Sequence, residues 1–378
     1  MEFKTIPFYN DNISEMGYGF EITRKGGRLI EMMDEYYRMP MEDRAENFSY
    51  LILEYALRIE DLAHIETYDH LKLCDVKIEK IYHGKYGLGT GKSWTKWNQL
   101  KLLSQELSLS IYKKGKKEPF CYKSFTMLHQ KIVFKYDDMC NRKKFEPFPG
   151  EYEIKFIPNR SSFRVCYHAL KCMKDYNLEL FFEKFEDVPK NNVLKSIDEV
   201  EKFEWFDEKI SSNKEQIIAI KNIVNCTAFP LPFVIFGPPG TGKTSTLVEC
   251  IAQIIVHKPT SHILISAQSN SACDEIGKRL MKVVSYNKIF RFQSSYNLKS
   301  TDKEQFNILN SYCPDQYPSY EELYHFSIVI VTLSMSSRLI QAHVKKDHFD
   351  YIFIDECGAA SEPESLVPII GKINCYYK

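Results

Sequence analysis

Short apolar runs alternate with helical repeats through the second half of the chain. The runs, each typical of a strand buried on both faces, are Ile263-Leu264-Ile265, Ile328-Val329-Ile330-Val331 and Tyr351-Ile352-Phe353-Ile354. Ahead of the first run, four apolar residues recur at the spacing of one helix face. They are Leu247, Ile251, Ile254 and Ile255. This order, which begins at about Phe206, predicts an α/β fold in which helices cover a parallel sheet.

The first half of the chain follows other patterns. From about Asp43 to Tyr68, apolar residues recur every three or four positions, which predicts a long amphipathic helix. Its apolar stripe consists of Phe48, Ile52, Tyr55, Ile59 and Leu62. The residues that fall off this stripe are Arg58, Glu60 and Asp61.

Residues 70–170 contain shorter, β-like runs, such as 131–136 and 152–157, separated by glycines and by Pro149-Gly150. This spacing predicts a small antiparallel barrel or sandwich. The cluster Lys113-Lys114-Gly115-Lys116-Lys117 is basic. It fits either a solvated hairpin tip or a contact with phosphate, and the sequence leaves both open.

The strongest chemical signal is Gly237-Pro238-Pro239-Gly240-Thr241-Gly242-Lys243-Thr244, which fits the phosphate-binding P-loop. Its glycines permit positive φ and close approach to a phosphate, and the following helix points its positive dipole end at the same group. Lys243 is expected to reach the β- and γ-phosphates, and Thr244 to bind Mg²⁺. The apolar residues 233–236 are predicted to form a short buried strand before the loop.

Two further segments complete a predicted ATP site, to which Ser245 is added as the next residue of the loop. The amide of Gln216 offers the donor and acceptor that suit N7 and N6 of adenine, although a surface glutamine is the alternative. The third apolar run leads into Asp355 and Glu356. In a P-loop ATPase, Asp355 would hold Mg²⁺ with Thr244, and Glu356 would act as general base toward the attacking water.

Polar residues that follow the other two strands are candidates for contact with a nucleic-acid backbone. Ser269 and Asn270 follow the first run, and Thr332 and Ser334 follow the second. Because the carboxyl ends of parallel strands meet at the edge where ligands bind, these side chains could hydrogen-bond phosphodiester groups without reading sequence. A helix cap and an ordinary turn are the structural alternatives for the two pairs.

Composition narrows the class of protein. A length of 378 residues with 44% hydrophobic and 14% aromatic content indicates a globular protein of two or three domains. No apolar run approaches the roughly 18–20 residues of a membrane span, and we identify no secretory signal. The 11 cysteines form no Cys-x-x-Cys pair, so we expect reduced thiols, no zinc site and a cytoplasmic location. Zero net charge only slightly weakens a nucleic-acid interpretation, because a local groove can still be basic.

Taken in order, these motifs resemble the superfamily 1 helicases of the up-frameshift type, and most of all the Armitage and Moloney leukemia virus ten helicases of RNA silencing. The resemblance covers about residues 45–370. It rests on Gln216, the P-loop octapeptide, Ser269-Asn270-Ser271, residues 355–365, residues 159–164 with His168-Ala169-Leu170, and residues 57–61 with Tyr68-Asp69.

The resemblance implies an ATP- and Mg²⁺-dependent RNA helicase, mostly 5′-to-3′ in direction, with two RecA-like domains and an inserted barrel. It also implies single-stranded RNA as ligand, Argonaute-class partners in small-RNA pathways, and cytoplasmic ribonucleoprotein granules. Only the resemblance favours RNA over DNA, because the motifs contact backbone. Cys273 and Cys357 stand where many relatives carry small apolar residues, and cysteine is small enough to be tolerated there.

Together these patterns predict a helical region or stalk over 1–69, a β-barrel accessory domain over 70–170, a linker or stalk over 171–205, and a first RecA-like P-loop domain over 206–378. The Gly-Asp-x-x-Gln-Leu segment, the second RecA-like domain and its arginine fingers do not occur in the sequence. An arginine finger is worth roughly 10³–10⁵ in turnover, so we expect weak ATP binding and little hydrolysis from these residues alone. A helicase core and a non-catalytic RNA- or protein-interaction module both stay open.

Overall fold

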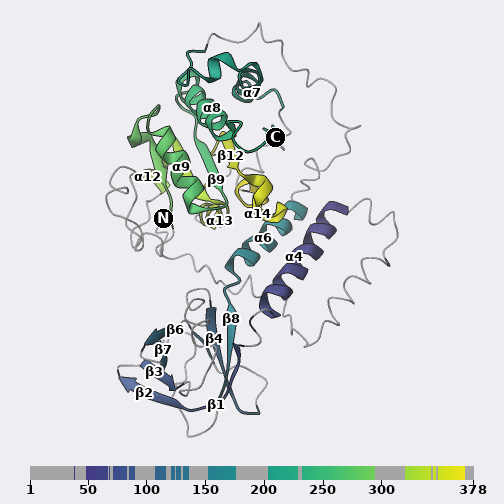
Figure 1. The fold of residues 1–378 in the computed structure, drawn as a ribbon, viewed down its shortest axis with the longest axis vertical. Helices are drawn as coiled ribbons and strands as arrows, with labels where there is room; N and C mark the ends of the chain where they lie inside the picture. Colours follow the sequence, from purple (N-terminus) through teal and green to yellow (C-terminus); the bar gives the residue numbers. More distant parts are fainter. Residues whose placement is uncertain are drawn as a thin grey trace. The chain divides into compact units, whose positions relative to one another are not determined.

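The computed structural model describes residues 38, 48–66, 68, 71–82, 85–89, 107–115, 121–123, 125–128, 131–135, 152–175, 203–228, 232–293, 320–341, 344–345 and 348–370. They belong to two compact units. The β unit has its described residues within Tyr55–Phe163, and most of the α/β unit lies within Arg164–Lys378 (Figure 1). None of the described helices combines the length and apolar character that a membrane crossing requires.

The β unit contains two antiparallel sheets of four strands each, in the orders β1-β8-β4-β5 and β2-β3-β7-β6. The strands of both sheets, apart from β5, are labelled in Figure 1. The strands are β1 (Leu73–Val76), β2 (Ile78–Tyr82), β3 (Lys85–Gly89), β4 (Leu107–Lys113), β5 (Cys121–Lys123), β6 (Phe125–Leu128), β7 (Lys131–Lys135) and β8 (Tyr152–Pro158).

Strand β8 illustrates how the sequence builds this unit. Tyr152, Ile154 and Phe156 are buried, and the residues between them are half-buried, which is the period of a strand with one face on a core. The ring of Phe156 lies 5.4 Å from that of Phe125 in the other sheet, and one buried cluster draws on both sheets. The predicted antiparallel strands are therefore confirmed, whereas closure into a barrel stays a prediction because the pairing gives two sheets.

The basic cluster at 113–117 lies partly within the described residues. Strand β4 ends at Lys113, and Gly115 follows with a φ of 79° in the turn after β4. Lys113 and Lys114 are exposed, as expected for a hairpin tip. Lys116 and Lys117 lie outside the described residues.

Helix α4 (Phe48–Glu66) confirms the predicted helix, and of the predicted stripe only the side chain of Ile59 lies among those that the structure describes. Ile59 is half-buried, whereas Leu53, Leu57 and Asp61 are buried. Asp61 forms an ion pair with Arg160, whose Nε donates to Asp61 Oδ1 at 2.7 Å across a separation of 99 residues. An apolar repeat does not report a charged residue that is buried with a distant partner.

The α/β unit contains one sheet in the order β10-β11-β9-β12, and all three strand pairs are parallel. This confirms the predicted parallel sheet. Its strands are β9 (Ile263–Ala267), β10 (Ile289–Arg291), β11 (Ile328–Thr332) and β12 (Tyr351–Asp355). Its helices are α6 (Ser161–Asp175), α7 (Lys214–Val224), α8 (Lys243–His257), α9 (Asn270–Leu280), α12 (Tyr320–Tyr324), α13 (Leu333–Gln341) and α14 (Glu362–Ile370), with short 3₁₀ turns η5 (Ile210–Ser212), η6 (Tyr286–Lys288) and η7 (Cys357–Ala359).

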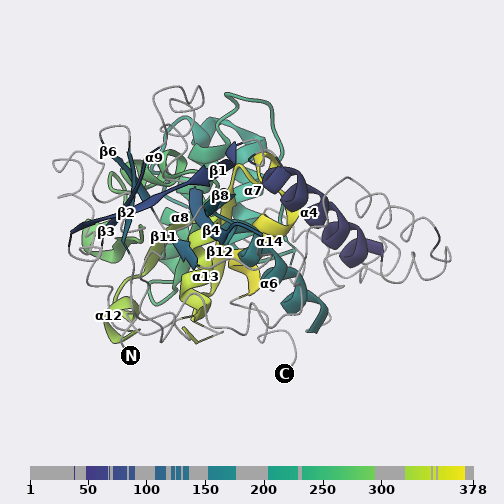
Figure 2. The same cartoon turned by 90° about the horizontal axis from the view of Figure 1, so that it is seen from below.

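Helices cover both faces of this sheet. Ile263 and Ile265 of β9 share a buried cluster with α7, α8 and α9, whereas Leu264 between them shares another with α12 and α13. Helices α8 and α9 pack against each other, and so do α13 and α14 (Figures 1 and 2). Because the strands are buried on both faces, their sequences read as continuous apolar runs.

One predicted strand does not form. Residues 233–236 were expected to lie buried before the P-loop, but the described residues 232–238 contain no strand. Val234 and Phe236 are 73% and 94% exposed. Four consecutive apolar residues indicate a preference for burial, but a strand also needs free backbone groups on a neighbour, which composition does not report. Within the described residues, β12 pairs with β9 alone.

Candidate nucleotide and nucleic-acid site

The P-loop has the backbone conformation that its glycines predict. Gly240 and Gly242 have φ values of 82° and 88°, in the left-handed region that other residues avoid. Gly242 is also the N-cap of α8, and a Cβ there would lie 2.9 Å from Nε2 of Gln216. A Cβ on Gly237 would lie 2.6 Å from Oγ1 of Thr241. The backbone angle therefore favours glycine at Gly240 and Gly242, and a side chain at Gly237 or Gly242 would have to displace the Thr241 hydroxyl or the Gln216 amide.

The loop lysine and threonine have defined partners. Lys243 Nζ donates to the backbone oxygens of Gly237 at 2.7 Å and Pro238 at 3.0 Å, so the ammonium lies against the loop. Thr244 Oγ1 donates to Asp355 Oδ2 at 3.1 Å across 111 residues of chain. A hydroxyl and a carboxylate that meet at the start of a helix are the hard oxygen ligands that Mg²⁺ takes. The residues present thus fit the predicted metal.

The adjacent carboxylates of Asp355 and Glu356 have different surroundings at the end of strand β12. Asp355 is buried, and its Oδ1 accepts from the N–H of Glu356 at 3.0 Å. Glu356 is exposed and has a φ of 54°. Such a conformation costs a non-glycine residue about 1–3 kcal/mol and collects at functional sites. The turn places Asp355 beside Thr244, as a metal ligand requires. It leaves Glu356 exposed to solvent, as a general base requires.

Gln216 lies beside the P-loop. Its backbone N–H donates to Oδ1 of Asn213, the N-cap of α7, at 3.2 Å. Its Nε2 donates to Oγ1 of Thr246 at 2.8 Å and to the backbone oxygen of Gly242 at 3.4 Å. The side chain is therefore held at the start of α8, beside the P-loop.

Two further contacts tie this region together and were not singled out from the sequence. Glu249 of α8 is buried and accepts from the backbone N–H groups of Phe206 and Asp207, each at 3.1 Å. Ser245 Oγ accepts from Nη1 of Arg279 at 3.1 Å, which joins α8 to α9. The sequence signal for the Glu249 contact was an acidic residue inside the largely apolar stretch 247–255.

The predicted backbone-binding residues gather at one edge of the sheet. Ala267 at the end of β9 is in register with both Thr332 and Asp355. Ser269 and Asn270 follow Ala267 at the start of α9. The candidate nucleic-acid contacts therefore lie at the same edge as the carboxylate of the nucleotide site.

Three of these polar side chains already have protein partners. Ser269 Oγ caps α9 by accepting from the N–H of Ala272 at 3.1 Å. Asn270 Oδ1 accepts from Nη2 of Arg291 at 2.9 Å. Ser334 Oγ donates to Oε1 of Glu364 at 3.1 Å. The structural alternative of a cap thus applies to Ser269, whose Oγ also lies 3.0 Å from Oγ of Ser271.

Comparison with known proteins finds several helicases that are similar to this chain. A family model described as an AAA domain matches residues 211–308. The chain is 42% identical over 171 residues to a helicase named MOV-10 of Gallus gallus, covering 44% of this chain and 18% of that protein. It is 35% identical over 171 residues to the RNA helicase Mov10l1 of Homo sapiens, covering 44% and 14%. It is 28% identical over 275 residues to an RNA helicase named armi of Drosophila melanogaster, covering 65% and 23%.

These relatives bear out the resemblance that the motifs indicated, because the chain is similar to helicases of the Mov10 and Armitage type. The chain spans between 14% and 23% of the length of these three curated relatives. The matched region 211–308 holds the P-loop, α8, β9 and α9.

One residue of this site was missed altogether by sequence reasoning. Arg291 is buried at the end of β10 and contacts Asn270. The signal was present in Ile289-Phe290-Arg291-Phe292, because a charged residue inside an apolar strand needs a specific partner.

Proposed function

We propose that this chain is the nucleotide- and RNA-binding first RecA-like domain of a Mov10-type RNA helicase, preceded by an accessory antiparallel β domain. The observation that carries the proposal is the meeting of Thr244 with Asp355 at 3.1 Å beside a loop of left-handed glycines. A chance glycine-rich turn would not bring the end of a distant buried strand to the start of the following helix.

Each residue of the site has a role in this proposal. The loop amides and Lys243 bind the phosphates of ATP, and Thr244 with Asp355 holds Mg²⁺. Gln216 contacts the adenine, and Glu356 polarises the attacking water. Bound ATP supplies the phosphoryl group whose transfer to water drives the helicase.

RNA is proposed to bind at the same sheet edge, through its phosphodiester backbone, at Ser269, Asn270, Thr332 and Ser334. The names of the relatives Mov10l1 and armi, both RNA helicases, support RNA over DNA. Argonaute-class partners, a role in RNA silencing and a location in cytoplasmic ribonucleoprotein granules stay predictions from the family resemblance.

Photocrosslinking tests the nucleotide site. With 8-azido-ATP and Mg²⁺, the parent chain is expected to be labelled, and Lys243→Ala to lose the label, because the phosphates lose their only side-chain cation in the loop. Lys278→Ala, which removes an exposed lysine from α9, serves as the matched control and should crosslink like the parent. Equal labelling of Lys243→Ala and the parent would refute the ATP site.

Binding of single-stranded RNA tests the second half of the proposal. A helicase core should change its RNA affinity when a non-hydrolysable ATP analogue is added, because both ligands bind at one sheet edge. RNA binding that ignores the nucleotide would instead support the non-catalytic interaction module. Competition with DNA of matched sequence distinguishes the two nucleic acids.

A further inference from the structure

Arg291 is the bulkiest of the fully buried side chains in the described part of the chain, and its side chain is 0% exposed. A guanidinium ion without water must satisfy its charge and its N–H groups within the protein. The partners that do so therefore indicate why the protein retains a charge at the end of strand β10.

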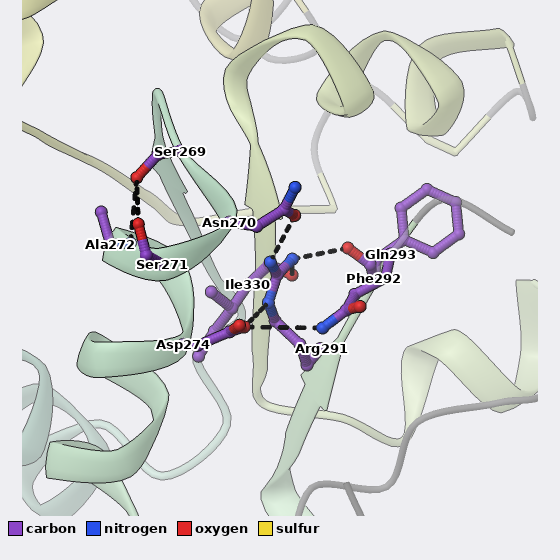
Figure 3. Close-up of polar contacts among 9 residues, drawn as sticks. All are labelled: Ser269, Asn270, Ser271, Ala272, Asp274, Arg291, Phe292, Gln293 and Ile330. Carbon is purple, nitrogen blue, oxygen red and sulfur yellow. Dashed lines mark hydrogen bonds and ion pairs between the residues drawn. The ribbon is translucent and has the colours of Figure 1, made fainter. Parts of the chain in front are cut away.

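Every nitrogen of this guanidinium has a partner (Figure 3). Nε donates to Oδ1 of Asp274 at 2.8 Å, and Nη2 donates to Oδ1 of Asn270 at 2.9 Å. Nη1 donates to the backbone oxygens of Phe292 at 2.7 Å and Ile330 at 3.4 Å. The ion pair with Asp274 compensates the charge, and the two carbonyls fasten the group to β10 and β11.

Asn270 and Asp274 lie four positions apart on α9 and therefore on one face of the helix. Arg291 binds both, so a single side chain ties the first turn of α9 to the neighbouring sheet. Gln293, also buried, adds a longer contact from its Nε2 to Oδ1 of Asp274 at 3.5 Å.

The contact with Asn270 fixes which way its amide faces. An asparagine amide has an oxygen that only accepts and a nitrogen that only donates. Because a guanidinium only donates, the oxygen of Asn270 must face Arg291, and the nitrogen must face away from it. Figure 3 shows this arrangement, with the amide nitrogen of Asn270 directed away from Arg291. A phosphodiester oxygen only accepts, so the outward-facing group is the one that an RNA backbone requires.

We propose that Arg291 is a positioning residue for RNA binding, which holds the amide nitrogen of Asn270 toward a backbone phosphate. The inference rests on the RNA-binding function proposed above. Arginine suits this position better than lysine because its planar fork reaches Asp274, Asn270 and two carbonyls at once, which an ammonium group does not.

A double-mutant cycle tests the proposal, with fluorescence anisotropy of labelled single-stranded oligo(U) RNA as the readout. Asn270→Ala is expected to weaken RNA binding about tenfold, through loss of a hydrogen bond to a charged group. Arg291→Lys should weaken it about three- to tenfold in the parent. In the Asn270→Ala background, Arg291→Lys should change the affinity less than about twofold, because the amide that it positions has gone.

Arg291→Lys should leave the affinity for a fluorescent ATP analogue within about twofold of the parent, since Arg291 contacts no residue of the P-loop in the described structure. Equal losses of RNA affinity in both backgrounds would mean that Arg291 only supports the fold, and the inference would be overturned. A parent chain that binds no RNA would refute the RNA-binding proposal itself, and the inference with it.

A second variant leaves the buried guanidinium in place, in case Arg291→Lys does not fold. Asn270→Asp keeps one oxygen for Arg291 and puts the other where the amide nitrogen was, so repulsion should take RNA affinity below that of Asn270→Ala. Ser285→Asp adds the same charge at an exposed site outside this cluster and controls for non-specific repulsion. If Asn270→Asp binds RNA as well as Asn270→Ala does, the proposed orientation is wrong.

Discussion

At the scale of single residues, a buried thiol links the stability of the α/β unit to pH. Cys250 is fully buried in α8, and burial, reinforced by the neighbouring charge of Glu249, raises its pKa above the ordinary value. An unfolded thiol has a pKa of about 8.5. Above that pH the unfolded chain releases a proton that the folded chain retains. The stability contributed by the neutral thiol is therefore complete below about pH 8.5 and is lost as the pH rises.

The expected slope is about 1.4 kcal/mol of unfolding free energy per pH unit for one such thiol. Cys250→Ala should make the decline between about pH 8.5 and 10 shallower by roughly that amount, whatever its effect at neutral pH. Urea unfolding at a series of pH values measures it. Cys357→Ala, which removes an exposed thiol of the same unit, serves as the control. A parent-like slope in Cys250→Ala would contradict the burial of an un-ionised thiol.

Buried charges are the residues that the sequence predicted least well. Asp61, Glu249 and Arg291 are all buried, and each has partners remote in sequence or on the backbone of another segment. Their partners arise from tertiary contacts, which one-dimensional patterns do not encode. The turn of the P-loop was predictable because it is local: eight consecutive residues specify it, and Gly240 and Gly242 have the positive φ that the motif predicts.

At the scale of elements, Phe290 and Phe236 allow the structure to be tested against the sequence pattern. Both belong to short apolar runs, but Phe290 of β10 is 1% exposed and Phe236 is 94% exposed. Phe290→Ala should destabilise the α/β unit by about 3–5 kcal/mol, from lost burial and the cavity that remains. Phe236→Ala should change stability by no more than about 0.5 kcal/mol. Denaturant unfolding of the two variants measures the difference.

The comparison of Phe236→Ala with Phe290→Ala tests whether residues 233–236 form the buried strand that the sequence predicts. A loss for Phe236→Ala as large as that for Phe290→Ala would mean that the strand forms in solution and that the exposed arrangement is wrong. The parallel strands β9, β11 and β12 were predictable because their residues are buried on both faces and their apolar runs are continuous. Residues 233–236 are as apolar as these strands, but they pair with no neighbour in the described structure and form no strand.

At the scale of the whole molecule, each of the two units has a buried cluster of its own among the described residues. The buried cluster of the β unit contains residues from Tyr68 to Phe156, whereas the clusters of the α/β unit draw on residues from Ile210 onward. Chains with independent cores commonly unfold in more than one transition. We therefore expect two thermal transitions in calorimetry, one for each unit.

Two variants and one ligand assign these transitions. Arg160→Ala removes one ion pair of the Asp61 carboxylate, whose side chain is 4% exposed. That loss should cost the β unit about 3–5 kcal/mol. Lys131→Ala breaks an exposed ion pair with Glu79 in the same unit and should cost at most about 1 kcal/mol.

Phe290→Ala should lower only the other transition. ATP with Mg²⁺ at about 100 times its Kd should stabilise that second transition by about 2.7 kcal/mol and leave the first unchanged. A single transition that both variants and the nucleotide shift together would mean that the two units unfold as one.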